Sequence, residues 1–134
     1  MSSRARDALI PYSYARFADA KAFVFRMWCE FAAERHAPAP ADLSGACKYG
    51  SLFVREVFGG VIEGHYAHQF NRVGGRLVDI GHDALDVGSM RNPYLHDADY
   101  FMVPEYRARL ASCALRVDGW VAGFIRETGT LDGP

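Results

Sequence analysis

Two adjacent glycines near the middle of the chain restrict the possible fold most strongly. Gly74 and Gly75 separate two runs of β-compatible residues, 61–73 and 76–80. A two-residue Gly-Gly loop between such runs favours a tight antiparallel hairpin. Val73 then opposes the first residue after the loop, and pairing continues outward from there. The sequence therefore predicts two antiparallel strands with a defined register.

This register brings a histidine close to an aspartate. Because side chains alternate between the two faces of a strand, His68, Phe70 and Asp79 share one face. His68 and Asp79 are diagonal neighbours, about 7 to 8 Å apart, a gap that two side chains can close with a hydrogen bond. In a regular strand His65 and Gln69 point to the opposite face. We therefore expect His68, and not His65, to bond to Asp79.

A predicted helix before the hairpin carries a cysteine at its start. Ser44 is a good N-cap and the pair Gly59-Gly60 is a good stop, so residues 45–58 are expected to be helical. Cys47 then lies in the first turn, where unpaired amides and the helix dipole favour a thiolate and lower the thiol pKa. A free cysteine is also commonly a small buried hydrophobe. Position alone leaves both interpretations open.

Helices are also expected on both sides of this central region. Apolar residues recur at three- and four-residue steps over about 13–34, and a closing helix starts near Pro104. The Ala-Pro segment 37–41 interrupts the helical pattern, and residues 86–100 are expected to be an irregular connection. The predicted fold class is α+β, with helices packed on a small antiparallel sheet. The chain length fits a single domain, 1–134.

Composition narrows the possible partners and the compartment. Half of the residues are hydrophobic and the formal net charge is −1, which favours neither disorder nor nucleic-acid binding. We see no signal peptide and no run of about 20 apolar residues, so we expect no membrane partner and a cytoplasmic protein. The odd number of cysteines argues against a disulfide framework. Cys29 and Cys113 lie on apolar helical stripes and are expected to be structural.

A metal site is the less favoured use of the histidines. His65 and His68 could join His82, Asp83 and Asp86 around one ion. The alternation of a regular strand turns the first two histidines apart, whereas metal ligands must converge. We therefore predict no metal and no cofactor.

Cys47, His68 and Asp79 together form a candidate catalytic triad. A thiolate attacks an acyl carbon, an imidazole takes the thiol proton and later protonates the leaving group, and a carboxylate fixes the imidazole tautomer. Water as the second attacker gives hydrolysis, and an amine gives acyl transfer. The backbone amide of Cys47 is one expected oxyanion donor, and the sequence does not identify a second.

The order of these residues resembles that of the transglutaminase-like and papain-like cysteine enzymes. More narrowly, it is similar to the small bacterial YunG-like proteins. The motifs that carry this similarity are Cys47 with Phe58-Gly59-Gly60, His68-Gln69-Phe70-Asn71-Arg72, and Gly75 with Val78-Asp79-Ile80. The resemblance implies a papain-like or transglutaminase-like core and Cys47, His68 and Asp79 as the triad. Gly81, Ala84 and Leu85 depart from it, since that family is expected to have threonine, glutamine and an aromatic residue there.

Two functions follow as hypotheses. The first is a cysteine hydrolase or acyl transferase that acts on a peptide, protein or small amide or thioester through an acyl-Cys47 intermediate. The second is a non-catalytic binding protein on the same fold, in which Cys47, His68 and Asp79 form only a buried polar network.

Overall fold

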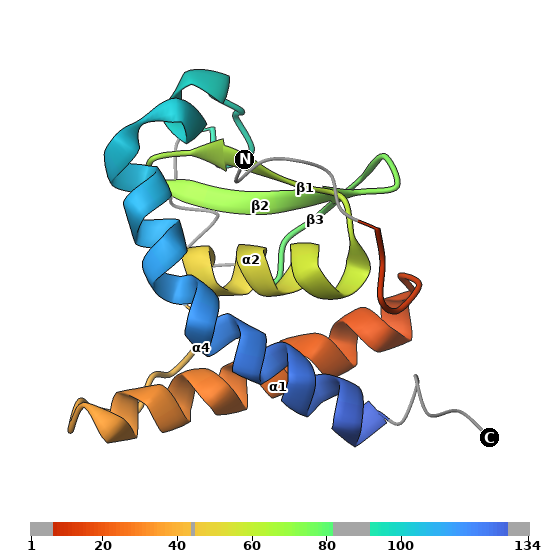
Figure 1. Ribbon diagram of the computed structural model, residues 1–134, viewed down its shortest axis with the longest axis vertical. Helices are drawn as coiled ribbons and strands as arrows, with labels where there is room; N and C mark the ends of the chain where they lie inside the picture. Colours follow the sequence, from red (N-terminus) through yellow and green to blue (C-terminus); the bar gives the residue numbers. More distant parts are fainter. Residues whose placement is uncertain (1–6, 44, 82–91, 129–134) are drawn as a thin grey trace.

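A computed structural model describes residues 7–43, 45–81 and 92–128. This part of the chain has an α+β fold in which three helices accompany a three-stranded antiparallel sheet (Figure 1). The elements, in chain order, are α1 (Tyr14–Glu34), α2 (Cys47–Phe58), β1 (Val61–His65), β2 (His68–Val73), β3 (Arg76–Val78), the short 3-10 helix η1 (Ala98–Met102) and α4 (Pro104–Thr128). The predicted fold class is confirmed at this level.

Helix α2 is the central element of the fold. It lies between the sheet on one side and helices α1 and α4 on the other (Figure 1). Three phenylalanine rings join the helices: Phe23 of α1, Phe53 of α2 and Phe124 of α4, with centroids 5.4 to 6.0 Å apart. Since α2 is covered on both sides, most of its residues are buried. Its N-terminal residue, Cys47, is therefore held in place by packing of α2 against the sheet and against the other helices.

The ends of the helices largely follow the sequence signals. Ser13 caps α1 by accepting a hydrogen bond from the Arg16 amide, and α4 begins at Pro104 as expected. Helix α2 ends at Phe58, followed by Gly59 with a φ of 82°. It begins at Cys47, two residues later than the predicted start, and its N-cap Ala46 makes no side-chain capping bond. The predicted cap, Ser44, lies outside the described residues.

The predicted hairpin is confirmed with its register. β2 and β3 pair antiparallel with Val73 opposite Arg76, and the loop glycines Gly74 and Gly75 both have positive φ, 56° and 78°. Those values belong to the tight hairpin turn that a Gly-Gly loop favours. β3 itself ends at Val78. The hairpin therefore fixes the direction of the chain as it enters the segment that contains Asp79.

The run 61–73 forms two strands, and not the single strand that the sequence pattern indicates. β1 and β2 pair antiparallel around a two-residue turn, Tyr66-Ala67, so that His65 lies directly opposite His68. Neither turn residue is a glycine, proline, asparagine or aspartate, the types that usually mark a turn. Gly64 permits the tight approach: its φ is 126°, and a Cβ there would lie 2.3 Å from the His68 carbonyl oxygen.

The connection before α4 is partly described. Residues 82–91 lie outside the described part, and the remainder of the predicted irregular connection ends in η1. Two hydrogen bonds bind this segment to β1: Asp97 donates its amide to the Gly64 carbonyl oxygen at 2.8 Å, and the Gly64 amide donates to Nδ1 of the His96 side chain at 3.1 Å. No described helix combines the length and the apolar character needed to cross a membrane.

Candidate active site

The structure brings His68 and Asp79 into direct contact. Nε2 of His68 lies 2.6 Å from Oδ2 of Asp79, and the two side chains are only 8% and 5% exposed. The other carboxylate oxygen, Oδ1, accepts the Gly81 amide at 3.1 Å. Both oxygens are therefore held, which fixes the plane of the carboxylate that faces the imidazole.

This contact determines which ring nitrogen can act as a base. A carboxylate only accepts hydrogen bonds, so Nε2 of His68 carries the hydrogen that it donates to Asp79. The lone pair of the neutral ring then lies on Nδ1, for which no hydrogen bond is seen among the described residues. An imidazole held in this way can accept a proton at Nδ1.

Cys47 lies at the N-terminus of α2, but its thiol contacts Gln69 of β2 and not His68. Sγ donates to Oε1 of Gln69 at 2.9 Å, and Nε2 of Gln69 donates in turn to the His65 carbonyl oxygen. Gln69 is 2% exposed. Within the described residues no hydrogen bond links Cys47 to His68. The structure thus brings two members of the predicted triad together and joins the third to Gln69.

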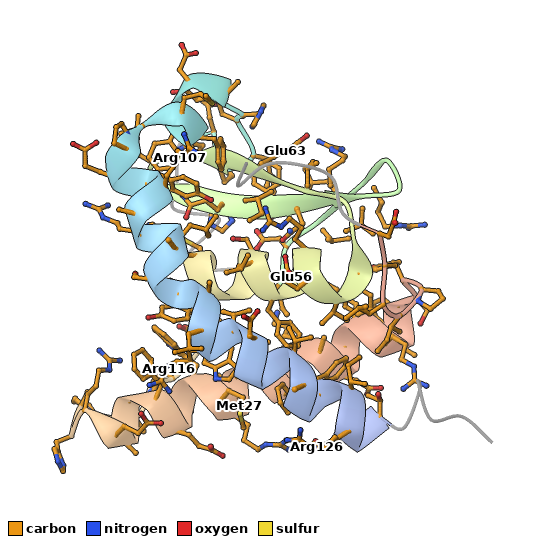
Figure 2. The ribbon with its side chains drawn as sticks, in the orientation of Figure 1. Met27, Glu56, Glu63, Arg107, Arg116 and Arg126 are labelled. Carbon is orange, nitrogen blue, oxygen red and sulfur yellow. The ribbon has the colours of Figure 1, made fainter. Side chains whose placement is uncertain are left out.

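The faces of the sheet explain this arrangement. Gln69 and Asn71 point toward α2, since the Asn71 side-chain amide donates to the Ser51 carbonyl oxygen at 2.9 Å. His68 and Phe70 alternate with them and lie on the other face. Glu63, the partner of Phe70 in the register, is seen on the side of the sheet away from α2 (Figure 2).

Gln69 is therefore a residue that the sequence reasoning missed. The alternation correctly turned it away from His68, but the face to which it turns is the one covered by α2 and Cys47. The available signal was the pair of amide side chains, Gln69 and Asn71, at inward-facing positions of a strand that is buried along most of its length. Buried amides require partners, and a helix start supplies them.

The prediction for His65 was wrong in its premise. It assumed one continuous strand that turns His65 away from His68, whereas directly opposed residues of an antiparallel pair share a face. The ring of His65 is nevertheless occupied: Nε2 lies 3.2 Å from the Asn92 carbonyl oxygen, and Nδ1 accepts the Ala67 amide at 3.3 Å. His65 thus braces the turn and the segment at Asn92.

The predicted lowering of the Cys47 thiol pKa is also wrong. Burial raises the pKa of this thiol, and the nearby Asp79 carboxylate raises it further. The backbone of Gln69, the Lys48 charge and the backbone of Cys47 itself act in the opposite direction, with less effect than burial. The helix start contributes as expected, but desolvation of the thiolate is the larger cost. Burial of Cys47 therefore favours the protonated thiol over the thiolate.

The other two cysteines lie on the helices predicted for them. All three cysteines are free. Cys113 of α4 is 4% exposed and burial raises its thiol pKa, whereas Cys29 of α1 is half-buried. Neither is joined to His68 or Asp79 by a hydrogen bond in the described part of the chain.

No cluster of three or more metal-binding side chains occurs among the residues that the structure describes. His82, Asp83 and Asp86, the other members of the metal alternative, lie outside those residues.

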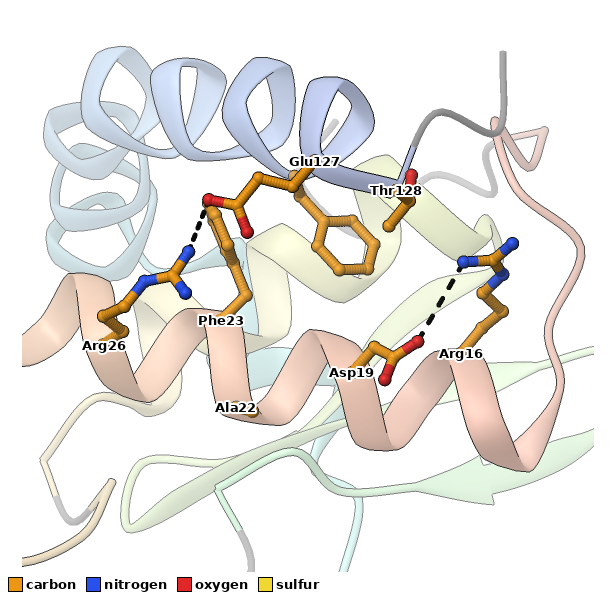
Figure 3. Close-up of a pocket in the computed structure, with 8 residues that line it drawn as sticks. Arg16, Asp19, Ala22, Phe23, Arg26, Glu127 and Thr128 are labelled. Atoms are coloured by element: carbon orange, nitrogen blue, oxygen red, sulfur yellow. Dashed lines mark hydrogen bonds and ion pairs between the residues drawn. The ribbon is translucent and has the colours of Figure 1, made fainter. Parts of the chain in front are cut away.

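A cavity of about 380 Å³ lies away from this site, between α1 and α4 (Figure 3). Two ion pairs lie along it, Arg16 with Asp19 and Arg26 with Glu127, and Phe23 contributes to its apolar lining. Its charged side chains thus already bind one another, and none of the predicted triad lines it.

Comparisons with protein-family models, with curated proteins and with solved structures find no match to this chain. The resemblance to the YunG-like proteins therefore stays a prediction that rests on the sequence motifs.

Proposed function

We propose that this chain is a cysteine-dependent hydrolase or acyl transferase that acts on an amide or thioester through an acyl-Cys47 intermediate. One observation carries the proposal: the buried His68–Asp79 pair, 2.6 Å apart, leaves Nδ1 of His68 as a base. The residue next to His68 in β2, Gln69, contacts the Cys47 thiol. A thiol at a helix start and an oriented imidazole are thus linked through two adjacent residues of β2.

The order of elements supports a papain-like or transglutaminase-like core. In that arrangement a helix carries the cysteine at its N-terminus, the next strands form an antiparallel sheet, and the histidine and the aspartate come from consecutive segments of that sheet. Cys47 begins α2, His68 begins β2, and Asp79 follows β3. The same order underlies the proposed kinship with the YunG-like proteins.

The reaction begins with a change in the Cys47 side chain. Because His68 lies on the opposite face of the sheet and is the first residue of β2, the reaction requires Sγ to leave Oε1 of Gln69 and to meet Nδ1 of His68 around the end of the strand. Nδ1 then takes the thiol proton. The thiolate attacks the acyl carbon, so that a C–S bond forms and the carbonyl oxygen becomes an oxyanion. The imidazolium then gives its proton to the leaving nitrogen or sulfur as the bond to that atom breaks.

The second half regenerates the thiol. Water or an amine attacks the thioester and loses its proton to His68, the C–S bond breaks, and the imidazolium returns the proton to Cys47. Water releases a carboxylic acid and an amine yields a new amide. The Cys47 backbone amide serves as one oxyanion donor. The Gln69 amide is not the second donor in this geometry, because it donates to the His65 carbonyl oxygen.

Peptides, proteins and small amides or thioesters are the substrate classes that this chemistry accepts. The near-neutral net charge gives no support for nucleic acid as a partner. We propose that the protein is cytoplasmic, since its three cysteines are all free, as expected in a reducing compartment.

A second candidate is an interaction protein without catalysis. It is favoured by the contact between the Cys47 thiol and Gln69, together with the burial that raises the thiol pKa. In this function the Cys47–Gln69–His65 chain of hydrogen bonds fastens α2 to the sheet as a satisfied polar network.

Electrophilic amide and thioester probes separate the two functions. The enzyme should become labelled at Cys47, detected by peptide mapping, and Cys47→Ala should abolish the label. His68→Ala should slow labelling about a hundredfold, the scale of general-base catalysis. Cys29→Ser is the matched control and should label at the wild-type rate. Equal labelling rates in wild type and His68→Ala would favour the interaction protein.

A further inference from the structure

Tyr94 covers the face of the sheet that carries His68. Its ring centroid lies 6.1 Å from that of His68 at an interplanar angle of 62°, and 5.3 Å from that of Phe70 at 87°. Both are edge-to-face geometries, which aromatic rings prefer. Since His68 and Phe70 point away from α2, Tyr94 packs on them from the opposite side of the sheet.

The Tyr94 side chain also reaches the carboxylate of the pair. Burial raises the pKa of the Tyr94 phenol, and the Asp79 carboxylate raises it further through its charge and through hydrogen bonding, in which the phenol can only be the donor. Asp79 thus has the Tyr94 hydroxyl near it, besides the two groups that donate to its oxygens, Nε2 of His68 and the Gly81 amide. One tyrosine thus touches both members of the buried pair, with its ring on the imidazole and its hydroxyl on the carboxylate.

The chain on both sides of Tyr94 is fastened to β1. Before it, the Asn92 carbonyl oxygen lies 3.2 Å from Nε2 of His65. After it, His96 accepts the Gly64 amide at 3.1 Å and Asp97 donates its own amide to the Gly64 carbonyl oxygen at 2.8 Å. These contacts hold the chain on both sides of Tyr94 against β1, in addition to the contacts of the Tyr94 ring itself.

We propose that Tyr94 is a positioning residue for the reaction proposed above, which fixes the Asp79 carboxylate through its hydroxyl and shields the His68–Asp79 bond from water with its ring. The inference rests on the proposed function for its catalytic consequence. Its structural consequence, a sheltered and correctly protonated imidazole, is independent of any activity. The contacts of Tyr94 seen in the described part of the chain are with His68, Phe70 and Asp79, so its effect on the reaction passes through His68.

Two substitutions separate the two roles of the side chain. Tyr94→Phe keeps the ring and removes the hydroxyl, whereas Tyr94→Leu removes both. Tyr66→Phe is the matched control, since Tyr66 is 80% exposed in the turn between β1 and β2. Circular dichroism first verifies that each variant is folded, and Tyr94→Phe, the most conservative change, keeps the test possible if Tyr94→Leu does not fold.

Proton NMR of the His68 ring measures how well its Nε2 hydrogen is protected from water, a local property that differs from the free energy of unfolding. The exchange of the Nε2 hydrogen with water should accelerate about tenfold in Tyr94→Leu and about threefold in Tyr94→Phe, and remain unchanged in Tyr66→Phe. Unchanged exchange in both Tyr94 variants would overturn the inference. The probe labelling of Cys47 is measured on the same samples and should fall about fivefold in Tyr94→Phe at saturating probe, with the half-saturating concentration unaltered.

The two proposals fail in different ways. If no protein is labelled while the exchange accelerates as expected, Tyr94 positions the pair and the proposed enzyme function fails. If wild type is labelled through His68 but the Tyr94 variants match wild type in both readouts, the function stands and the role of Tyr94 is refuted.

Discussion

Replacing Gln69 with methionine tests what keeps the Cys47 thiol protonated. The hydrogen bond from Sγ to Oε1 of Gln69 exists only in the protonated form, so it stabilises the thiol relative to the thiolate. Methionine has nearly the same length and volume as glutamine and no strong acceptor. It therefore removes this bond while leaving the burial of Cys47 in place. We expect the thiol pKa to fall.

The magnitude follows from the bond that is lost. A hydrogen bond contributes about 1 kcal/mol net, and a thiol is a weak donor, so this figure is an upper value. Dividing it by 1.36 kcal/mol for each pKa unit gives a decrease of the Cys47 pKa by about 0.7. Well below that pKa, the thiolate fraction rises about fivefold. The loss of the bond to the His65 carbonyl oxygen also lowers the free energy of unfolding by about 1 to 3 kcal/mol.

The assay is the pH dependence of Cys47 alkylation by iodoacetamide, measured by peptide mapping below the unfolding temperature. Asn71→Ala is the control, because Asn71 is a buried amide on the same face of β2 whose bond goes to the Ser51 carbonyl oxygen and not to the thiol. It should destabilise the protein without moving the alkylation midpoint. An unchanged or higher midpoint in Gln69→Met would refute the role of Gln69.

Three further outcomes are expected. Asp79→Asn should lower the Cys47 thiol pKa, because the carboxylate raises it at rest; a resting thiolate–imidazolium pair predicts the opposite shift in the same alkylation profile. Gly64→Ala should lower the free energy of unfolding by about 3 kcal/mol or more, since its Cβ would lie 2.3 Å from the His68 carbonyl oxygen at a φ of 126°; urea denaturation measures it, and a loss below about 1 kcal/mol contradicts the geometry. In the native protein Cys113, 4% exposed, should react more slowly with a thiol reagent than Cys47, and the reverse order in peptide mapping would exclude Cys47 as the reactive thiol.

The hairpin was predictable because its information is local. Gly74 and Gly75 adopt the positive φ that their sequence allows, and the register of β2 and β3 follows from the loop length. The turn at Tyr66-Ala67 could not be read in the same way, since neither residue has a turn preference. The turn depends instead on Gly64, whose missing Cβ lets β1 and β2 approach each other. Local sequence patterns do not reveal such a contact between two strands.

The contact between Cys47 and Gln69 depends on which face of the sheet α2 covers. Alternation divides β2 into two sets, but each set mixes polar and apolar residues, so periodicity alone does not rank them. The charged residues show which face α2 does not cover: Glu63 and Arg72, which pair with each other, lie on the same face as His68. An apolar helix packs on the other face. This choice required the pairing of β1 with β2, which the sequence pattern concealed.

The resting bond to Gln69 is too weak to exclude catalysis. Rotation away from Gln69 costs about 1 to 3 kcal/mol, because the buried Oε1 loses its donor, which is a factor of about 5 to 160 in rate, whereas general-base catalysis contributes about a hundredfold to ten-thousandfold. The contribution of His68 to the reactivity of Cys47 is therefore the quantity that separates an enzyme from a structural network. A double-mutant cycle with Gln69→Met and His68→Ala measures it as the alkylation rate at one pH. If the freed thiol turns to His68, His68→Ala should slow alkylation more in the Gln69→Met background than in wild type. Rates that multiply independently would mean that the thiol never meets the imidazole, and the interaction protein would then be the better description.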